Sequence, residues 1–359
     1  MAETEGIPCL LMRGGTSKGA YFLASDLPAG PEERDALLLR IMGSPDPRQI
    51  DGLGGAHPLT SKVAVVSPYP DGDADVDYLF LQVGVDEAVV SSRQNCGNLL
   101  AGVGPFAVER GLVRAGGDHT EVRIRMLNTG SFATAAFPTP GGWPQYDGDL
   151  AIDGVPGTAA PVRLNFEGTA GSSTGALFPT GRVMDTVDGL AVTCVDNGMP
   201  SVLLRAADLG LAGDESPEEL EADAALADRL AGLRKAAATL MGMGDVSKAT
   251  VPKLVLLSPP RGGGTVTTRS FLPVRVHTSI GVLGALTVAA GILADGSVGH
   301  GLAALPGPGD PCRIEHPTGQ FDVEVGLTAG PDGITVTRSA ALRTARKIFD
   351  GRVFPRPRP

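Results

Sequence analysis

The sequence predicts a mixed α/β (α+β) protein of two similar domains, and three observations support this. Short runs of strand-forming residues recur along the 359 residues, separated by clusters of Gly, Pro and Asp such as PYPDGDAD. The 50 Gly and 29 Pro favour turns and short strands over long helices. Two apolar helical segments, NCGNLLAGVG and SIGVLGALT, occupy similar places in the two halves of the chain.

The predicted strands are rich in Val, Ile, Leu and aromatic residues, which fit a pleated and half-buried surface. They cover residues 7–12, 63–66, 78–85, 122–126, 192–195 and 254–258.

Three helices are predicted. The first follows Cys96 and contains Pro105, which we expect to kink it. The second begins at Ser216, because SPEE supplies an N-cap Ser, a Pro in the first turn and a Glu at the third position. The third covers residues 281–293 and is apolar nearly all round, so we expect it to be buried. The apolar face of the second helix is expected to contain Leu226, Leu230, Leu233, Ala237 and Leu240.

The first and third helices can be overlaid, which suggests an internal repeat. Gly97 then falls on Gly281, with Leu99 on Leu283 and Ala101 on Ala285, and each helix follows a strand-like segment. We therefore expect an N-terminal domain of residues 1–190 and a C-terminal domain of residues 191–359. A chance match of a few small or apolar residues is the alternative explanation.

Composition excludes several classes of function. The net charge of −10, the pI near 5.0 and the 4% aromatic content are unsuited to binding nucleic acid, which requires a basic face and favours stacking platforms. The start of the chain lacks the pattern of a signal peptide, and no apolar run is long enough to span a membrane. No strand–GxGxxG–helix unit for a nicotinamide cofactor is present.

The cysteines and histidines show no metal-binding spacing. We therefore expect a cytoplasmic protein that uses no metal or organic cofactor and has no nucleic-acid or membrane partner. A homo-oligomer is compatible with the sequence.

Four segments rich in Gly and hydroxyl or amide side chains are candidate anion-binding loops. Backbone N–H groups and short donors in such loops can close around an anion, although ordinary turns are the simpler interpretation of any one of them. The segments are RGGTSKG (13–19), DGLGGAHPLTSK (51–62), QNCGN (94–98) and GSSTGALFPTG (171–181).

Cys96 differs from the other cysteines in its surroundings. A lone Cys is usually a small buried apolar residue, and Cys9 and Cys194 fit that description because they lie in apolar runs. Cys96 instead lies in a polar turn that opens a helix, where the helix dipole and unpaired N–H groups favour the thiolate. It is therefore a candidate acid or base.

Lys62 is the candidate partner of Cys96. It ends a polar segment and leads directly into the apolar run VAVV, which predicts a partly desolvated amine suited to proton exchange. Lys18, in TSKG, is the competing lysine; a solvated turn lysine is its simpler interpretation.

These motifs together resemble the PrpF family of aconitate-type isomerases over nearly the whole chain. The resemblance rests on RGGTSKG, RQIDGLGGAHPLTSKVAVV, QNCGN, IDGVPGTAAPV, GALFPTG, VDNGMPSV, GDVSKATVPK, RSF and TARKIFDG, which occur in this order. It implies a fold like that of diaminopimelate epimerase, in which two similar domains each wrap a β-sheet around a central helix and the active site lies in the cleft between them.

The resemblance also implies which residues react. The epimerase uses two facing cysteines; Cys96 matches the first, but the overlay places Ile280 at the second position. The PrpF family pairs its cysteine with the lysine of the TSK motif, here Cys96 and Lys62. One departure from the family pattern is His57-Pro58, where relatives usually have other small or polar residues.

The implied reaction is keto–enol tautomerisation of the tricarboxylate 4-oxalomesaconate, a step in gallate or protocatechuate degradation. The alternative is cis-trans or double-bond isomerisation of 2-methylaconitate or a related itaconate. A non-catalytic tricarboxylate-binding protein would need no base, which the presence of both Lys62 and Cys96 disfavours. The reaction needs one base, one acid and donors for the developing negative charge. The predicted substrate-binding residues are Arg13, Thr16, Ser17, Ser61, Gly97, Asn98, Arg269 and Ser279.

Overall fold

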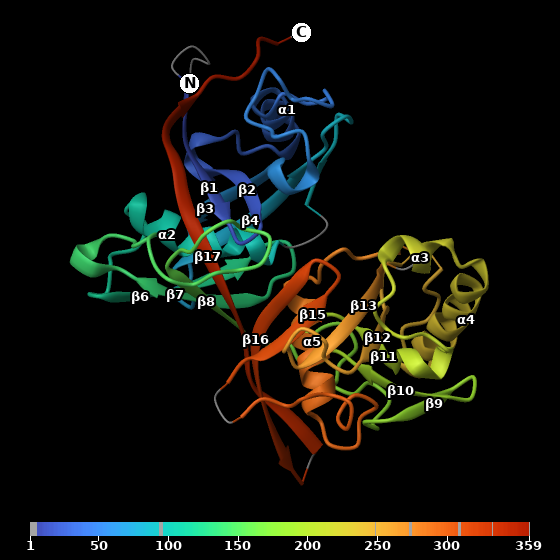
Figure 1. Cartoon of the computed structure of the whole chain (residues 1–359). Helices are drawn as coiled ribbons and strands as arrows, with labels where there is room; N and C mark the ends of the chain where they lie inside the picture. Colours follow the sequence, from blue (N-terminus) through green and yellow to red (C-terminus); the bar gives the residue numbers. More distant parts are fainter. Residues whose placement is uncertain are drawn as a thin grey trace. The chain divides into compact units, whose positions relative to one another are not determined.

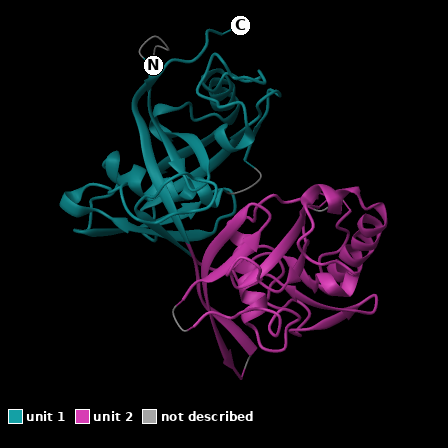
Figure 2. Cartoon of the chain, in the orientation of Figure 1, with its two compact units in different colours: residues 1–165, 342–359 teal, residues 166–341 magenta. Residues whose placement is uncertain are grey.

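The chain folds into two compact units. The computed structural model describes residues 6–92, 96–247, 249–272, 275–307, 310–331 and 333–358 (Figure 1). One unit consists of residues 1–165 and 342–359, and the other of residues 166–341 (Figure 2). This division differs from the predicted one at 190/191, because the boundary falls earlier and the C-terminal residues return to the first unit.

Two local features explain the difference. Residues that follow 165 bond within the second unit: the Gly171 N–H donates to the Asp196 carbonyl over 2.8 Å, and the Asp196 N–H donates to the Leu177 carbonyl over 2.8 Å. The last strand, β17 (Gly333–Val353), pairs first with β16 (Gly319–Gly330) and then with β1 (Ile7–Gly14). A single strand of 21 residues therefore pairs with strands of both units, whereas the composition predicted short strands throughout.

The first unit contains one mixed sheet. Hydrogen bonding gives the strand order β17–β1–β2–β3–β4–β6–β7, in which β2/β3 and β4/β6 are parallel and the other neighbours are antiparallel. A short strand, β5, also pairs with β4, and β8 pairs with β17. The remaining elements are β2 (Ser17–Leu23), β3 (Lys62–Pro68), β4 (Val76–Val83), β5 (Val90–Ser91), β6 (His119–Met126), β7 (Phe132–Pro138), β8 (Pro161–Phe166), α1 (Pro31–Met42) and α2 (Gly97–Glu109).

A helix packs on each face of this sheet. Helix α2 contacts β1, β2, β3, β4, β6 and β7, so the sheet curves around it (Figure 1). Ten of its thirteen residues are buried, which matches a helix with no polar face. Helix α1 packs on the other face, where Leu38 and Ile41 join Val63 and Val65 of β3 in one apolar cluster. The side chains of each strand thus alternate between an α1 face and an α2 face.

The second unit repeats this arrangement. Its strand order is β9–β10–β11–β12–β13–β15–β16–β17, with β11/β12 and β13/β15 parallel. Helix α5 contacts β10, β11, β15 and β16, and α4 packs with β12 on the other face. The bounds are β9 (Asp185–Val187), β10 (Leu190–Val195), β11 (Ser201–Arg205), β12 (Lys253–Ser258), β13 (Val266–Leu272), β14 (Arg275–Val276), β15 (Cys312–His316), α3 (Pro217–Ala222), α4 (Ala224–Leu240) and α5 (Val282–Leu293).

The predicted internal repeat is therefore confirmed as a repeat of topology. Strands β1–β2–β3–β4–β6–β7 correspond to β10–β11–β12–β13–β15–β16, with the same parallel pairs, and α2 corresponds to α5. The helix starts differ from the overlay by one residue. Cys96 and Gly281 are the two N-caps, and their carbonyls accept from the N–H groups of Leu100 and Ala285. The structural counterpart of Cys96 is therefore Gly281, not Ile280.

All six predicted strands and the three helical regions are confirmed, with two differences. Ser216 begins α3 with the expected capping box, but Asp223 then interrupts the helix because its carboxylate caps α4 by accepting the Leu226 N–H over 2.9 Å. Leu240, expected on the buried face, is 44% exposed at the end of α4. Helix α2 continues through Pro105 to Glu109.

Gly102 shows how closely α2 packs on the sheet. A Cβ atom at Gly102 would lie 2.5 Å from the Tyr21 hydroxyl oxygen, and that hydroxyl donates to the Leu99 carbonyl over 2.6 Å. We expect Gly102→Ala to lower the melting temperature, because overpacking costs roughly 1–3 kcal/mol. The matched control is Gly284→Ala in α5, where the nearest atom lies at 3.5 Å; it should raise the melting temperature through helix propensity. Equal effects of the two substitutions would contradict this packing.

Candidate active site

Lys62 is the first residue of β3, and its amine is buried. The side chain is 6% exposed, its Nζ donates to Gln82 Oε1 over 2.7 Å, and it lies 4.9 Å from the centre of the Phe80 ring. Gln82 is directly opposite Lys62 in the antiparallel β3–β4 pair, which brings the two side chains together. The predicted removal of this lysine from solvent is confirmed.

Cys96 is the N-cap of α2 and is only partly buried. Its carbonyl accepts from the Leu100 N–H over 3.0 Å and from the Tyr78 hydroxyl over 3.3 Å. Burial raises the pKa of Tyr21 and of Tyr78, and the nearby Cys96 thiol raises both further. Two buried hydroxyl-bearing rings therefore lie within electrostatic reach of the thiol.

Lys62 and Cys96 lie on the same side of the sheet. In β4, Tyr78, Phe80 and Gln82 alternate onto one face, and the Tyr78 hydroxyl on that face reaches the start of α2. Because Lys62 bonds to Gln82, it belongs to this α2 face as well.

Arg343 of β17 is a further cation on the α2 face, and no sequence motif indicated it. The residue is 4% exposed, and its Nη2 donates to Asn98 Oδ1 over 2.8 Å. Burial lowers the pKa of Arg343 to about 10; Arg13 acts in the same direction and the Cys96 thiol in the opposite one. Asn98 also donates from Nδ2 to Thr16 Oγ1 over 3.1 Å. Three segments distant in sequence thus meet at the start of α2.

Ser17 adds an unusual hydroxyl to this face. It lies on the same face of β2 as Gly19 and Tyr21, so it faces α2 as Tyr21 does. The side chain is 2% exposed, and its Oγ has no hydrogen-bond partner among the described residues. A buried hydroxyl without a partner is costly, which is consistent with a donor reserved for a ligand.

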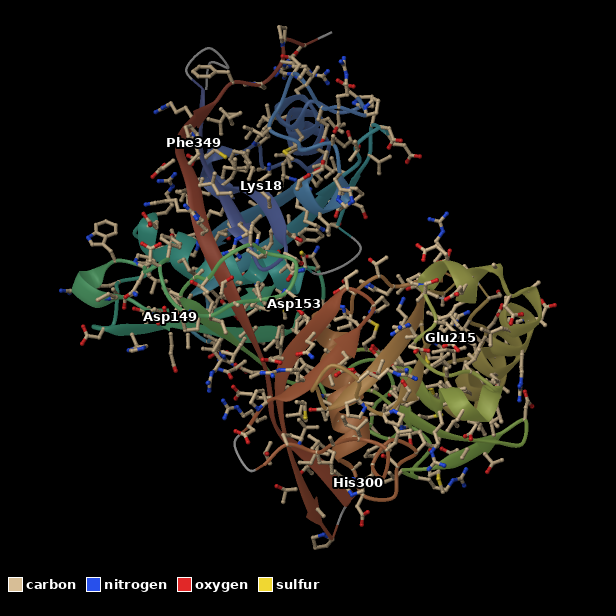
Figure 3. The ribbon with its side chains drawn as sticks, viewed as in Figure 1. Lys18, Asp149, Asp153, Glu215, His300 and Phe349 are labelled. Carbon is tan, nitrogen blue, oxygen red and sulfur yellow. The ribbon has the colours of Figure 1, made fainter. Side chains whose placement is uncertain are left out.

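The predicted clamp Arg13 and the competing Lys18 lie on the other face. They are cross-strand partners in β1 and β2, and they alternate with Gly14 and Ser17, which face α2. Arg13 Nη1 donates to the carbonyls of Gly15 and Thr344 and to Thr344 Oγ1, so it fastens the hairpin to β17. Lys18 is drawn in Figure 3. The structure does not bring either cation to the α2 face.

RGGTSKG is therefore a β-hairpin, not an open loop. Residues Gly15 and Thr16 form its turn, and Gly15 has a φ of +52°. A Cβ at Gly15 would lie 2.2 Å from Asn98 Oδ1, so only Gly lets the turn approach the start of α2 this closely.

The second predicted clamp, Arg269, belongs to the second unit and lies away from α5. It is opposite Leu256, a member of the apolar cluster that includes α4. Its Nε donates to the Glu215 carbonyl over 2.6 Å, and Nη1 donates to the Thr268 carbonyl over 2.9 Å (Glu215 is drawn in Figure 3). Arg269 therefore stabilises the loop before α3 through its hydrogen bond to Glu215. Ser279, also in the second unit, precedes α5 and lies 3.4 Å from His316 Nε2.

Two of the predicted anion-binding segments have internal partners. In residues 171–181, the Ser173 and Thr174 N–H groups and the Thr174 hydroxyl donate to one carboxylate oxygen of Asp196. The anion that this loop binds is therefore the Asp196 carboxylate of the same chain. In residues 51–62, Ser61 is fully buried and its Oγ accepts from Gln49 Nε2 over 2.8 Å. Within QNCGN, Gln94 and Asn95 lie outside the described residues.

His57 has a local role. Its Nδ1 accepts from the Leu59 N–H over 3.1 Å and so caps the short 3₁₀ turn Pro58–Thr60. The imidazole is exposed. The His57-Pro58 departure from the family pattern thus shapes the loop that leads to Lys62.

The other three cysteines differ sharply from Cys96. Cys9, Cys194 and Cys312 are all buried, and burial raises the pKa of each thiol to about 12. They are therefore thiols, not thiolates, at neutral pH.

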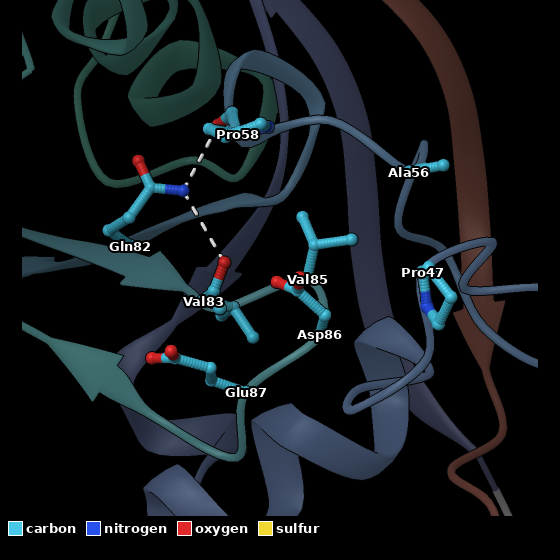
Figure 4. Close-up of a pocket in the computed structure, with 9 residues that line it drawn as sticks. Pro47, Ala56, Pro58, Gln82, Val83, Val85, Asp86 and Glu87 are labelled. Carbon is cyan, nitrogen blue, oxygen red and sulfur yellow. Dashed lines mark hydrogen bonds between the residues drawn. The ribbon is translucent and has the colours of Figure 1, made fainter.

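A cavity of about 470 Å³ lies behind Gln82 in the first unit (Figure 4). It is lined by Pro47, Ala56, Pro58, Gln82, Val83, Gly84, Val85, Asp86 and Glu87. Two carboxylates at its wall make it unsuited to a tricarboxylate, because like charges repel.

Membrane-spanning helices and metal-ligating clusters are both absent from the described residues. No helix among them combines the length and the apolar character needed to cross a membrane. No group of three or more His, Cys, Asp or Glu side chains among them is arranged to hold a metal ion.

The model of the family described as PrpF protein matches residues 4–356 of the chain. The chain belongs to the PrpF family. A 4-oxalomesaconate tautomerase of Pseudomonas putida is 58% identical over 353 residues, covering 98% of this chain and 96% of its own. A (4E)-oxalomesaconate Delta-isomerase of a Novosphingobium species is 56% identical over 351 residues, covering 98% of each chain.

Solved structures agree with this PrpF assignment. A methylitaconate-delta-isomerase is 36% identical and superimposes with a TM-score of 0.86, covering 96% of this chain and 94% of its own. A hydroxyproline epimerase from Agrobacterium vitis has a TM-score of 0.54 at 16% identity, covering 98% and 94%, which shows a shared fold alone. The predicted epimerase-like α+β fold of this PrpF protein is thus confirmed.

Proposed function

We propose that this PrpF protein is a cofactor-independent isomerase that tautomerises 4-oxalomesaconate between keto and enol forms by proton transfer. One observation carries the proposal: the buried Lys62 amine lies on the face of the first sheet that α2 covers, and Cys96 is the N-cap of that helix. The relatives named for oxalomesaconate reactions, at 56% and 58% identity over nearly the full length, supply the substrate.

The chemistry matches this pair of groups. The keto and enol forms of 4-oxalomesaconate differ by one proton moved between a carbon and the carbonyl oxygen. One group removes a proton, the other returns one, and nearby donors stabilise the enolate between the two steps. Lys62 and Cys96 do this work in the proposed mechanism, in which either group can begin.

The three carboxylates require donors, and the start of α2 supplies them. The N–H groups of Gly97 and Asn98 begin the helix, where the dipole favours an anion. Ser17 adds its unpartnered hydroxyl, Thr16 lies beside Asn98, and Arg343 adds a positive charge. We assign carboxylate binding in this unit to these residues, and Arg343 replaces Arg13 as the proposed cation.

A second candidate is the shift of a carbon–carbon double bond in 2-methylaconitate or a related itaconate. The solved methylitaconate-delta-isomerase favours it, because its fold matches over 96% of this chain. Both reactions remove a proton beside a carboxylate or carbonyl, so the same two groups serve either one.

The purified protein should discriminate between the two substrates. We expect it to change the enol absorbance of 4-oxalomesaconate much faster than the uncatalysed rate, and to isomerise 2-methylaconitate with a lower kcat/KM. Proton NMR in D₂O should show one deuteron added to carbon for each enol molecule converted to the keto form, and one carbon-bound proton lost for each keto molecule converted to the enol. If 4-oxalomesaconate changed only at its uncatalysed rate while 2-methylaconitate isomerised quickly, the second candidate would replace the first.

A further inference from the structure

Gln82 has an unusually constrained side chain. Its Nε2 donates to the Ser61 carbonyl over 2.9 Å and to the Pro58 carbonyl over 3.0 Å, with the Val83 carbonyl at 3.4 Å (Figure 4 shows the Pro58 and Val83 contacts). Its Oε1 accepts from Lys62 Nζ over 2.7 Å. Both ends of one amide are therefore engaged.

These contacts allow a single orientation of the amide. A carbonyl oxygen accepts and never donates, so the NH₂ end must face Pro58 and Ser61. A flipped amide would place Oε1 against two carbonyl oxygens and present its N–H groups to the Lys62 amine. The backbone carbonyls of the loop thus fix the orientation of the Gln82 amide, and the amide oxygen Oε1 then points at the Lys62 amine.

We propose that Gln82 is a positioning residue that fixes the Lys62 amine for proton transfer. Lys62 follows directly on Ser61, so one side chain binds both the loop that leads to the lysine and the lysine's own amine. Among the described residues, Gln82 Oε1 is the hydrogen-bond acceptor that reaches Nζ. An ammonium has three N–H donors, so this arrangement orients the group while leaving capacity for a substrate. The catalytic part of the inference rests on the proposed function.

A neutral acceptor also matters for the charge on Lys62. A carboxylate at this position would bind the ammonium more strongly and hold the proton, whereas an apolar side chain would leave a buried cation without an acceptor. An amide lies between these extremes. It orients the amine in both protonation states without adding a charge.

Two substitutions of Gln82 separate this role from a merely structural one. Gln82→Met and Gln82→Glu both remove the donors to Pro58 and Ser61, so both disturb the loop. They change the electrostatics at Lys62 in opposite directions, because one removes the acceptor and the other adds a negative charge. Gln49→Met is the matched control, since Gln49 bonds to Ser61 and Ser44 but not to Lys62.

The direct readout is the ammonium signal of Lys62 in protein labelled with ¹⁵N at lysine side chains. The chain has six lysines, and the signal lost in Lys62→Met assigns Lys62. We expect the pH at which this signal titrates to fall in Gln82→Met, rise in Gln82→Glu and stay near the wild-type value in Gln49→Met. The limb of the kcat/KM pH profile that reports Lys62 should move with it, and kcat of Gln82→Met should fall by roughly ten- to a hundredfold at little change in KM.

The other titratable side chains on the surrounding elements are unchanged in these variants. They are Lys18 and Tyr21 of β2, Asp77 and Tyr78 of β4, Cys96 and Glu109 at the two ends of α2, His57 of the preceding loop, and Asp86 and Glu87 at the cavity that Gln82 lines. Opposite shifts of the Lys62 signal can therefore be assigned to position 82.

The outcomes distinguish the two proposals. If both Gln82 variants moved the Lys62 signal in the same direction, or neither moved it, Gln82 would be a loop-packing residue and the inference would be wrong. If the signal moved as expected but kcat and KM changed together, Gln82 would bind Lys62 without positioning it for the reaction. The proposed role of Gln82 in catalysis would then be wrong. If the wild type turned over neither 4-oxalomesaconate nor 2-methylaconitate, the proposed function would fail, while the shifts would still show that Gln82 sets the state of Lys62.

Discussion

Lys62→Met should lower the turnover of 4-oxalomesaconate by roughly 10²–10⁴-fold, the usual contribution of a well-placed proton-transfer group. Met fills a similar volume and suits a position that is 6% exposed, so the fold should remain intact. The loss should appear in kcat, because the donors at the start of α2 are unchanged. Steady-state kinetics that follow the enol absorbance measure kcat, and a circular dichroism spectrum shows whether the fold is intact.

Lys18→Met is the matched control for this prediction. Lys18 carries the same group on the neighbouring strand, but it alternates onto the face away from α2. It should retain most of the activity. Lys62→Met should still bind a tricarboxylate such as trans-aconitate, which calorimetry can measure. Full activity in Lys62→Met together with an inactive Lys18→Met would transfer the catalytic role to Lys18.

Cys96→Ser should also lower turnover by roughly 10²–10⁴-fold while leaving the fold intact. Ser is a preferred N-cap residue, so the start of α2 should be at least as stable as with Cys. A hydroxyl is a far weaker acid than a thiol and exchanges protons poorly near neutral pH. The control is Cys9→Ala, which removes a buried thiol in the same unit and should affect the melting temperature more than kcat. Near-normal turnover in Cys96→Ser would exclude the thiol from proton transfer.

Alkylation of the wild-type protein tests the same assignment chemically. With a pKa of about 12, Cys9, Cys194 and Cys312 are thiolates in roughly one molecule in ten thousand at pH 8, and all three are buried. Iodoacetamide should therefore modify Cys96 first, and trans-aconitate should slow the modification. Peptide mapping that finds Cys9 or Cys194 modified before Cys96 would contradict the assignment.

The predicted elements were accurate where a local pattern determines them. The strand at residues 63–66 and the capped helix at Ser216 follow from apolar spacing and from one N-cap motif. The break at Asp223 was missed because a carboxylate that caps a new helix resembles any polar helix residue in the sequence. The boundary at 165/166 was missed because the hydrogen bonds of residues 171–177 to Asp196 have no local signature.

The candidate cations also show that a local pattern does not reveal which face of a sheet a side chain occupies. Arg13 and Arg269 were predicted to bind carboxylates because Arg does so well. Arg13 instead lies on the sheet face away from α2 and Arg269 on the face away from α5, and both donate to backbone carbonyls. Arg343 was missed although it lies one residue before TARKIFDG. Nothing local distinguishes it from Arg346, whose side chain alternates onto the other face of β17.

The sequence by itself determined the family, the two-domain repeat, and the Lys62 and Cys96 candidates, because these depend on residue types and short spacings. Only the tertiary structure decided which polar groups accompany them. Strand pairing placed Gln82 opposite Lys62, and the return of β17 to β1 brought Arg343 to Asn98 across 245 residues. The physical reason is that a β-strand assigns alternate side chains to opposite faces, while long-range pairing decides which helix covers each face.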